Sequence, residues 1–134
     1  MNIAIASGAL AAILDHARTE APNEACGILF GNAGAIDRAV PAANVAAHPE
    51  RAFEIDPAAL LAAHRAARGQ GRQVVGWYHS HPNGAAEPSR TDAARAVEDG
   101  KFWLIAAAGA VTAWRVVPGG PVHDRFAALA LVAA

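Results

Sequence analysis

Val74-Val-Gly-Trp-Tyr-His-Ser-His-Pro82 is the stretch of this 134-residue sequence that most strongly indicates a β-strand. The part from Val74 to Ser80 is rich in β-branched and aromatic side chains, which favour strands. Side chains along a strand alternate between its two faces, so His79 and His81 share one face at the strand's end, close enough to hold one ion between them. Ser80, between them, points to the opposite face.

The segments around this strand predict an α/β fold of the α+β type, a mixed, largely antiparallel β-sheet flanked by helices. Apolar runs bounded by turn residues predict the other strands, and capping residues predict the helix starts. These strands are expected over residues 1–5, 26–31, 35–45, 51–55, 101–107 and 111–117, and within 122–132. Helices are expected from Ser7 up to Pro22, from Asp56 to about Gly69, and from Ser89 to about Glu98.

A third candidate ligand follows the histidine pair. If Ser89 caps the third helix, Asp92 falls in its first turn and faces back toward the end of the strand. Two imidazoles and one carboxylate are a typical ligand set for catalytic zinc, because they leave a fourth position open to water. Structural zinc sites more often close all four positions, usually with thiolates. Cys26 is the single cysteine, so a thiolate-rich structural site is excluded.

Hydrolysis at such a site needs a further carboxylate. Zinc lowers the pKa of a coordinated water to about 7, but a peptidase still needs a group that takes up the proton and returns it to the leaving amine. Glu24 is the favoured candidate, because it stands at the entrance to an apolar strand that is expected to be buried. The residues alone leave this as a preference over the glutamates in surface or loop segments, which are Glu20, Glu50, Glu54, Glu87 and Glu98.

These residues together form a recognisable pattern. The sequence contains Glu24 beside Cys26-Gly27, the run His79-Ser-His-Pro82 and, after six more residues, Ser89-Arg-Thr-Asp92. This combination resembles the motif of the JAMM, or MPN-plus, metallopeptidases. The pattern of that family is E…H-[S/T]-H-P…S-x-x-D. The resemblance extends from about residue 2 to residue 117, and its five points with a fixed interval from histidine to aspartate are far more specific than a lone H-x-H.

The resemblance implies the cytidine-deaminase-like MPN fold and a role for each motif residue. His79, His81 and Asp92 would bind one zinc ion, and Glu24 would act as general acid and base. Ser89 would help to stabilise the tetrahedral oxyanion, although a capping role alone would account for this serine and both roles can hold together. Pro82 matches a structural position of the family.

Four further protein classes share parts of this pattern or of the implied fold but fit the sequence less well. Amidohydrolase barrels use an H-x-H metal motif, but an eight-fold βα barrel typically needs about 250 residues. Zinc nucleobase deaminases need a P-C-x-x-C pattern, and this sequence has no second cysteine. A RadC-like protein of uncertain activity remains an alternative. So does a catalytically silent MPN scaffold for protein–protein interaction, a class that usually lacks the ligands.

Length and composition narrow the class of protein further. A chain of 134 residues fits one domain, expected over 1–134, and 54% hydrophobic against 17% charged residues predicts a compact core. Eleven basic and twelve acidic residues nearly cancel and are scattered, so nucleic acid is not an expected partner. The lone cysteine and the lack of a signal peptide or membrane span predict a cytoplasmic protein without membrane contact.

The resemblance also suggests a substrate class. Eukaryotic members of the family cleave isopeptide bonds to ubiquitin, whereas compact members resemble bacterial enzymes that trim small ubiquitin-like sulfur carriers of the ThiS or MoaD type. This short chain leaves little room for inserted ubiquitin-gripping segments. The expected target is therefore a peptide or isopeptide bond at the C-terminal tail of such a carrier, while the partner's identity and the oligomeric state stay open.

Aromatic residues and the cysteine give smaller predictions. Trp77 and Tyr78 alternate on the metal strand, so one is expected in the core and the other beside the cleft. Trp103 and Trp114 are expected as a cross-strand pair in the hairpin that follows the third helix. Cys26 is expected to be a small buried filler. The histidines without ligand spacing are expected on the surface or on helix faces, and these are His16, His48, His64 and His123.

Overall fold

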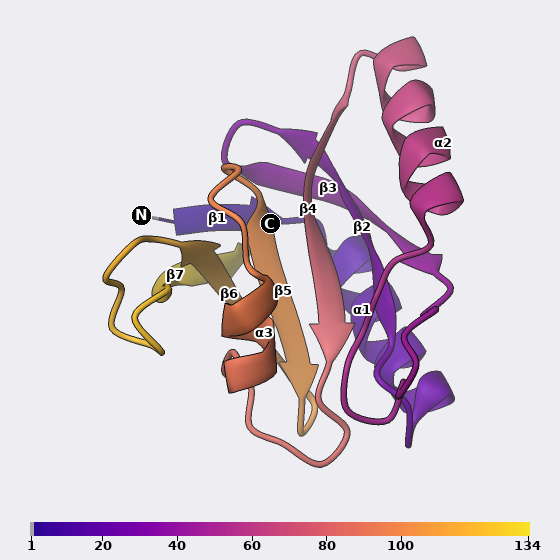
Figure 1. Ribbon diagram of the computed structural model, residues 1–134. Helices are drawn as coiled ribbons and strands as arrows, with labels where there is room; N and C mark the ends of the chain where they lie inside the picture. Colours follow the sequence, from indigo (N-terminus) through magenta and orange to yellow (C-terminus); the bar gives the residue numbers. More distant parts are fainter. Residues whose placement is uncertain (1) are drawn as a thin grey trace.

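The structure is a computed structural model that describes residues 2–134 (Figure 1). Met1, expected in the first strand, lies outside the described residues. In chain order the elements are β1 (Asn2–Ile5), α1 (Ser7–Glu20), β2 (Cys26–Asn32), β3 (Ala35–Ala42), α2 (Pro57–Gly69), β4 (Gln73–Ser80), α3 (Arg90–Arg95), β5 (Phe102–Ala107), β6 (Ala110–Val116) and β7 (Phe126–Ala133). Within residues 2–134, no helix is both long enough and apolar enough to cross a bilayer.

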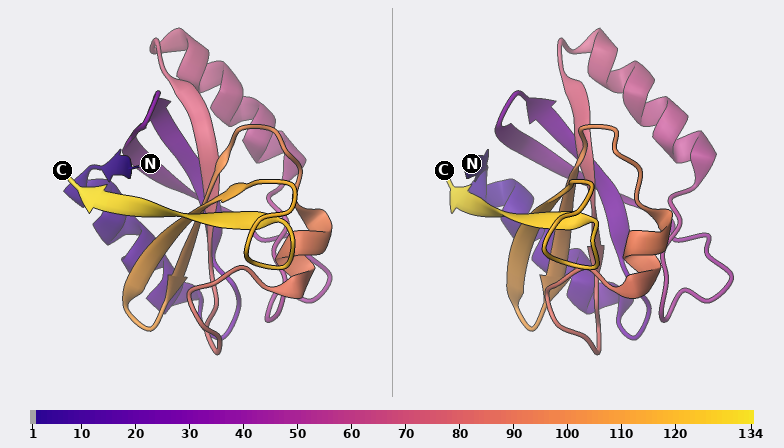
Figure 2. Two further views of the ribbon diagram at one scale, coloured as in Figure 1. Left: turned by 90° about the vertical axis from the view of Figure 1, so that its left-hand side faces the viewer. Right: turned by 60° about the vertical axis from the view of Figure 1, so that its left-hand side comes forward.

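The mixed, largely antiparallel sheet is confirmed, and its two ends meet to close a barrel. The strand order is β1-β3-β2-β4-β5-β6-β7, and β1 pairs in parallel with both β3 and β7. β4 and β5 are also parallel, whereas the other neighbouring pairs are antiparallel. The first and last strands therefore lie side by side, and the two ends of the chain are close together in Figure 2.

The helices cover opposite faces of this curved sheet. α1 packs against the inner face, where Ala9 and Ile13 join apolar side chains from the strands in one core cluster. α2 and α3 cover the outer face, each over a smaller cluster of its own (Figure 1). The alternation along β4 separates the two sides, because Tyr78 belongs to the inner core while Trp77 packs against the two outer clusters.

Two expected elements differ in the structure. Residues 51–55 do not form a strand; Ile55 makes only an isolated bridge to Asn44, and the segment belongs to the loop between β3 and α2. α3 ends at Arg95 rather than near Glu98, since the backbone of Ala96 is already extended. The chain then turns at Gly100, whose φ of 76° favours glycine, to bring β5 alongside β4.

The aromatic pairs are arranged largely as expected. Of Trp77 and Tyr78, one was expected in the core and the other beside the cleft. Tyr78 is buried in the core, but Trp77 does not line the cleft described below. Trp103 and Trp114 face each other across β5 and β6, which confirms the expected cross-strand pair. α1 begins at Ser7 as expected, although Ala6 rather than the serine occupies the capping position.

Candidate metal centre

The two histidines of the motif meet at the end of β4. His79 is 1% exposed and lies within the strand, while His81 follows it directly. The backbone N–H of His81 donates to the carbonyl of Ala106 at 2.9 Å, so the pairing with β5 continues past the end of the strand. Because the extended backbone keeps both imidazoles on one face, their Nε2 atoms lie 3.1 Å apart.

The first turn of α3 brings Asp92 to the same point. Oδ2 of Asp92 lies 3.1 Å from Nε2 of His79 and 3.2 Å from Nε2 of His81. A capping box holds this carboxylate in place: the N–H of Ser89 donates to Oδ2 at 2.9 Å, and the N–H of Asp92 donates to Oγ of Ser89 at 3.0 Å. The helix cap expected from the sequence is therefore present, and it orients a candidate ligand.

The spacing of the three atoms tests whether they fit a metal ion. Their separations of 3.1, 3.1 and 3.2 Å form a nearly equilateral triangle. Tetrahedral zinc with bonds of about 2.0–2.1 Å separates its ligand atoms by about 3.3 Å, so the triangle is close to the required size. Nδ1 of His81 donates to the carbonyl of Ala85 at 2.8 Å, because a carbonyl can only accept, and in the neutral imidazole this leaves the lone pair of Nε2 for an ion.

Burial and hydrogen bonding shift the pKa values of all three groups of the triad, and the shifts of His79 and Asp92 favour metal binding. Burial lowers the pKa of His79, which favours the neutral imidazole that a metal requires. Burial alone would raise the pKa of Asp92, but hydrogen bonds from His79 and His81 outweigh it and hold that pKa well below its usual value. Burial also acts to lower the pKa of His81, yet its hydrogen bond to Asp92 and the bond to the carbonyl of Ala85 raise it overall. The carboxylate therefore stays ionised between two imidazoles.

Glu24 reaches this centre from the segment that leads into the neighbouring strand, β2. β2 and β4 are antiparallel with Cys26 opposite His79, so the same register carried two residues further sets Glu24 opposite His81. Ser80 fixes that approach, because its Oγ accepts from the N–H of Ala25 at 2.8 Å and its own N–H donates to the carbonyl of Ala25 at 3.0 Å. One ligand atom each from Glu24, His79 and His81 fall within 4.8 Å of one another.

Burial distinguishes Glu24 from the other glutamates. Its side chain is 7% exposed, whereas Glu20, Glu50, Glu54, Glu87 and Glu98 are all exposed. Burial raises the pKa of Glu24 from 4.5 to about 7, with Asp92 acting in the same direction and His81 in the opposite one. Its Oε1 is buried and has no hydrogen-bond partner within residues 2–134. An unpartnered carboxylate oxygen beside a metal triad, with a pKa near neutrality, is suited to accepting and returning a proton.

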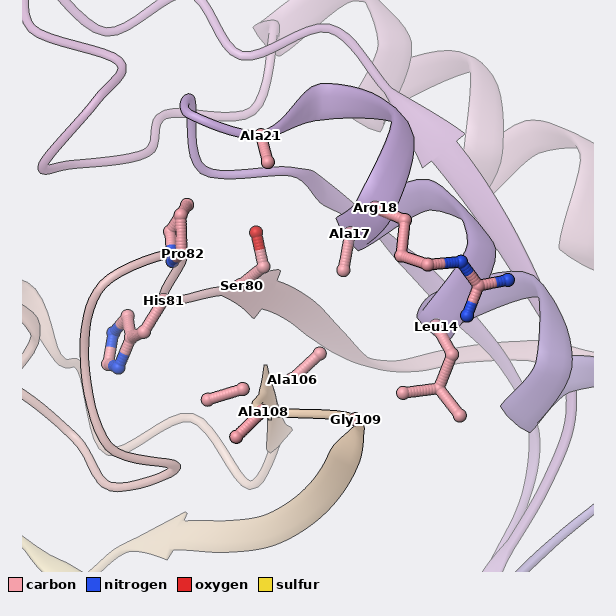
Figure 3. A pocket seen from close by; sticks show the side chains of 11 residues that line it. Leu14, Ala17, Arg18, Ala21, Ser80, His81, Pro82, Ala106, Ala108 and Gly109 are labelled. Atoms are coloured by element: carbon pink, nitrogen blue, oxygen red, sulfur yellow. The ribbon is translucent and has the colours of Figure 1, made fainter.

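Two cavities lie on either side of the His81-Pro82 segment. The first, about 370 Å³, opens onto the candidate centre, and its walls include Glu24, His81 and Ser89. The loop of residues 83–88 forms part of its wall, with Gly84 packed so closely under His81 that a Cβ there would lie 3.2 Å from the histidine's own Cβ. The second, about 250 Å³, lies between α1 and the ends of β4 and β5 and is lined mainly by small apolar residues (Figure 3).

The remaining histidines and the cysteine lie outside the triad. Cys26 is buried, as expected, and burial raises its pKa to about 12, so the thiol stays protonated and unreactive. His16 lies on α1, as expected for a helix-face position, and is half-buried there, where it shares a 2.7 Å hydrogen bond with the hydroxyl of Tyr78. His123 contacts the carbonyl of Pro88 at 2.9 Å. None of these side chains has the ligand spacing of the triad.

Two residues near the centre are not singled out by any sequence pattern. The Phe53 ring stacks on the imidazole of His79, with 4.3 Å between ring centroids and 18° between planes. The Asn44 side chain donates from Nδ2 to the carbonyl of Glu24 at 3.0 Å. Both belong to the long connection between β3 and α2, where the sequence predicts strand residues but no ligand motif. Nothing in the residues around Asn44 signals a contact 20 residues back in the chain.

Comparisons with known proteins identify a family and several relatives of this chain. A family model described as prokaryotic homologs of the JAB domain matches residues 6–117. The chain is 40% identical over 110 residues to a desampylase from Haloferax volcanii, covering 78% of this chain and 79% of the relative. It is 40% identical over 77 residues to a probable TtuB-protein conjugate cleaving protease from Thermus thermophilus, covering 58% of this chain and 51% of that protein. A CysO-cysteine peptidase from Mycobacterium tuberculosis is 34% identical over 96 residues, with 70% and 65% covered.

Solved structures share the fold over nearly the whole chain. A solution structure of protein DSY2949 from Desulfitobacterium hafniense matches with a TM-score of 0.84 at 26% identity, covering 100% of this chain and 93% of that one. AF2198, a JAB1/MPN domain protein from Archaeoglobus fulgidus, matches with a TM-score of 0.64 at 19% identity, covering 99% and 98%. At 19% identity, the match to AF2198 shows a shared fold and nothing more.

Proposed function

This chain belongs to the family of prokaryotic JAB-domain homologs, and we propose that it is a zinc-dependent peptidase or isopeptidase acting on the C-terminal tail of a small ubiquitin-like protein. The observation that carries the proposal is the nearly equilateral triangle of Nε2 of His79, Nε2 of His81 and Oδ2 of Asp92, with Glu24 beside it. A catalytically silent scaffold would have no need of that geometry.

Each residue of the centre has a distinct part in this proposal. His79, His81 and Asp92 would hold the metal, and zinc, when bound, would supply the Lewis acidity that polarises the scissile carbonyl and lowers the pKa of a coordinated water. Oε1 of Glu24 accepts the proton from the attacking water and returns it to the leaving amine. Its buried position and a pKa of about 7 suit it to both steps near neutral pH.

Ser89 can stabilise the developing oxyanion as well as cap α3. Its Oγ uses a lone pair to accept from the N–H of Asp92, so the hydroxyl proton stays free to donate. The serine also lines the 370 Å³ cleft, as Glu24 does. A free hydroxyl donor in a cleft beside the metal ligands is the arrangement that oxyanion stabilisation requires.

The substrate class rests on the relatives and on the size of the cleft. The names of two relatives specify a TtuB-protein conjugate and a CysO-cysteine bond. We propose a partner of the same kind, a small β-grasp protein of the ThiS or MoaD type whose flexible tail ends in Gly-Gly. Glycines would let the backbone pass the wall formed by the 83–88 loop, because they carry no side chain to meet it.

Cleavage of defined fusions tests the proposal. Sulfur-carrier proteins ending in Gly-Gly and fused to a reporter should be cut by the purified protein, and a chelator should abolish the reaction. Glu24→Gln keeps the side chain's shape, so it should retain about one zinc per chain while turnover falls by about 100-fold or more. His81→Ala should lose the metal. Cleavage that survives chelation, or full zinc in His81→Ala, would refute the assignment.

Tail sequence tests the substrate proposal separately. Replacing the terminal Gly-Gly with Leu-Leu should abolish cleavage while leaving metal content unchanged. Equal cleavage rates for the two tails would show that no narrow passage exists, and the protein would then be a peptidase of broader specificity.

A further inference from the structure

The connection between β3 and α2, residues 43–56, is here named the crossing loop. It runs past the outer side of the candidate metal centre and contacts two of its residues. The carbonyl of Pro49 accepts from the N–H of Glu24 at 2.7 Å, Asn44 contacts the carbonyl of the same glutamate, and Phe53 stacks on His79. A segment that touches both a candidate ligand and the candidate base is well placed to control their geometry.

From these contacts we propose that the crossing loop braces the metal centre from outside, with Phe53 as a positioning residue for His79 and Asn44 as the anchor that sets the loop. The proposal rests on the metal site of the proposed function, but not on its substrate. Neither residue touches the reacting atoms, so both act through the groups that they hold.

The Asn44 amide uses its whole hydrogen-bonding capacity within this loop. Nδ2 donates to the carbonyls of Glu24 and Ala52, both at 3.0 Å. Oδ1 accepts from the N–H of Ala46 at 3.0 Å and from that of Glu54 at 3.1 Å. Two carbonyls face the nitrogen and two N–H groups face the oxygen, which fixes the orientation of the amide. One side chain thus ties both ends of the loop to the entrance of β2.

Phe53, held by this anchored loop, restricts the orientation of the candidate ligand His79. Its ring lies flat against His79, while Trp103 meets the same imidazole edge-on, with centroids 5.8 Å apart and planes at 88°. An imidazole held on its face and its edge cannot rotate freely about its Cβ–Cγ bond, so Nε2 stays directed at Asp92. The carbonyl of Phe53 also accepts from the Arg95 guanidinium at 3.0 Å, which links the loop to α3, the helix that carries Asp92.

Zinc affinity is the property that this brace should change. Residues that orient metal ligands typically contribute about 10–100-fold in affinity or activity. Phe53→Leu keeps an apolar side chain and removes the flat stack, so we expect zinc to bind at least about 10-fold more weakly in competition with a chelator. Phe53→Tyr keeps the stack and should restore the affinity of the natural protein.

A matched control separates positioning from general stability. Phe30→Leu makes the same chemical change in the cluster under α2, away from the ligands, and should lower the melting temperature without changing zinc affinity. Equal zinc affinity in Phe53→Leu and the natural protein would overturn the proposal. So would equal losses in Phe53→Leu and Phe30→Leu, because both would then follow from stability alone.

The Asn44 anchor is tested by a double-mutant cycle on the same measurement. Asn44→Asp keeps the size and the acceptors but removes both donors, so it should also weaken zinc binding, whereas Asn32→Asp at the exposed end of β2 should not. If Asn44 acts through Phe53, the double variant should bind zinc no more weakly than Phe53→Leu alone. Fully additive losses would contradict the brace. A natural protein that binds zinc but cleaves no fusion would refute the proposed function and leave this inference standing.

Discussion

Helices α2 and α3 each begin with a polar capping residue, and the two caps differ in the other groups that they contact. At α2, Oδ1 of Asp56 accepts from the N–H of Ala58 at 3.1 Å, and Pro57 occupies the first helical position. At α3, Ser89 and Asp92 cap each other, and the same carboxylate oxygen meets two imidazoles. Asp56 is half-exposed, whereas Asp92 is 5% exposed.

The difference shows how one local device can serve two purposes. α2 is 13 residues long and buries Ala63 and Ala67 against the sheet, so its cap adds stability to a helix that packing already holds in place. α3 has only 6 residues, too few to be stable by helix propensity alone. Its cap therefore has to place the helix, and the carboxylate that completes the capping box also lies against the two candidate histidine ligands.

The largest effect expected from this comparison comes from Asp92→Asn. The variant keeps the side chain's shape and can still accept from the N–H of Ser89, but it lacks the charged oxygen that would bind zinc. We expect metal analysis after dialysis to fall from about one zinc per chain to nearly none, with turnover lost in parallel. Asp56→Asn is the matched control and should keep its zinc. Retention of zinc by Asp92→Asn would show that its role is capping alone.

Ser89→Ala should have the next largest effect. Loss of an oxyanion donor costs on the order of 2–4 kcal/mol of transition-state stabilisation. Loss of the cap costs a further ~1 kcal/mol of folding stability. We therefore expect kcat to fall by about 30-fold or more while zinc content is kept, measured on the Gly-Gly fusion together with metal analysis. Unchanged kcat with a lower unfolding free energy would leave capping as the only role of this serine.

The smallest effect is expected from Asp56→Ala. Removing an N-cap side chain lowers stability by about 0.5–2 kcal/mol. The urea midpoint should fall with little change in its slope, because the surface exposed on unfolding is the same. Zinc affinity and turnover should match those of the natural protein. A loss of zinc affinity here would mean that the two caps are coupled, and the distinction drawn between them would fail.

Features that depend on near neighbours in the chain follow from the amino-acid sequence alone. Period-two alternation puts His79 and His81 on one face, and the S-x-x-D spacing puts Asp92 in a capping box, so the triad can be predicted from local geometry. The helix starts and the two hairpins are predictable for the same reason. The resemblance to a known family then joins these local pieces into one site and adds the fold.

Which distant residues meet is a property of the folded molecule and not of any local pattern. The closure of the sheet depends on the parallel pairing of β1 with β7, across almost the whole chain, and no short-range pattern encodes it. Burial makes Glu24 unique among the glutamates, and burial arises only when the chain packs. Phe53 reaches His79, and Asn44 reaches Glu24, because the crossing loop folds back over the barrel. Such contacts carry no periodicity in sequence, since their spacing is set by the path of the backbone and not by the repeat of a helix or strand.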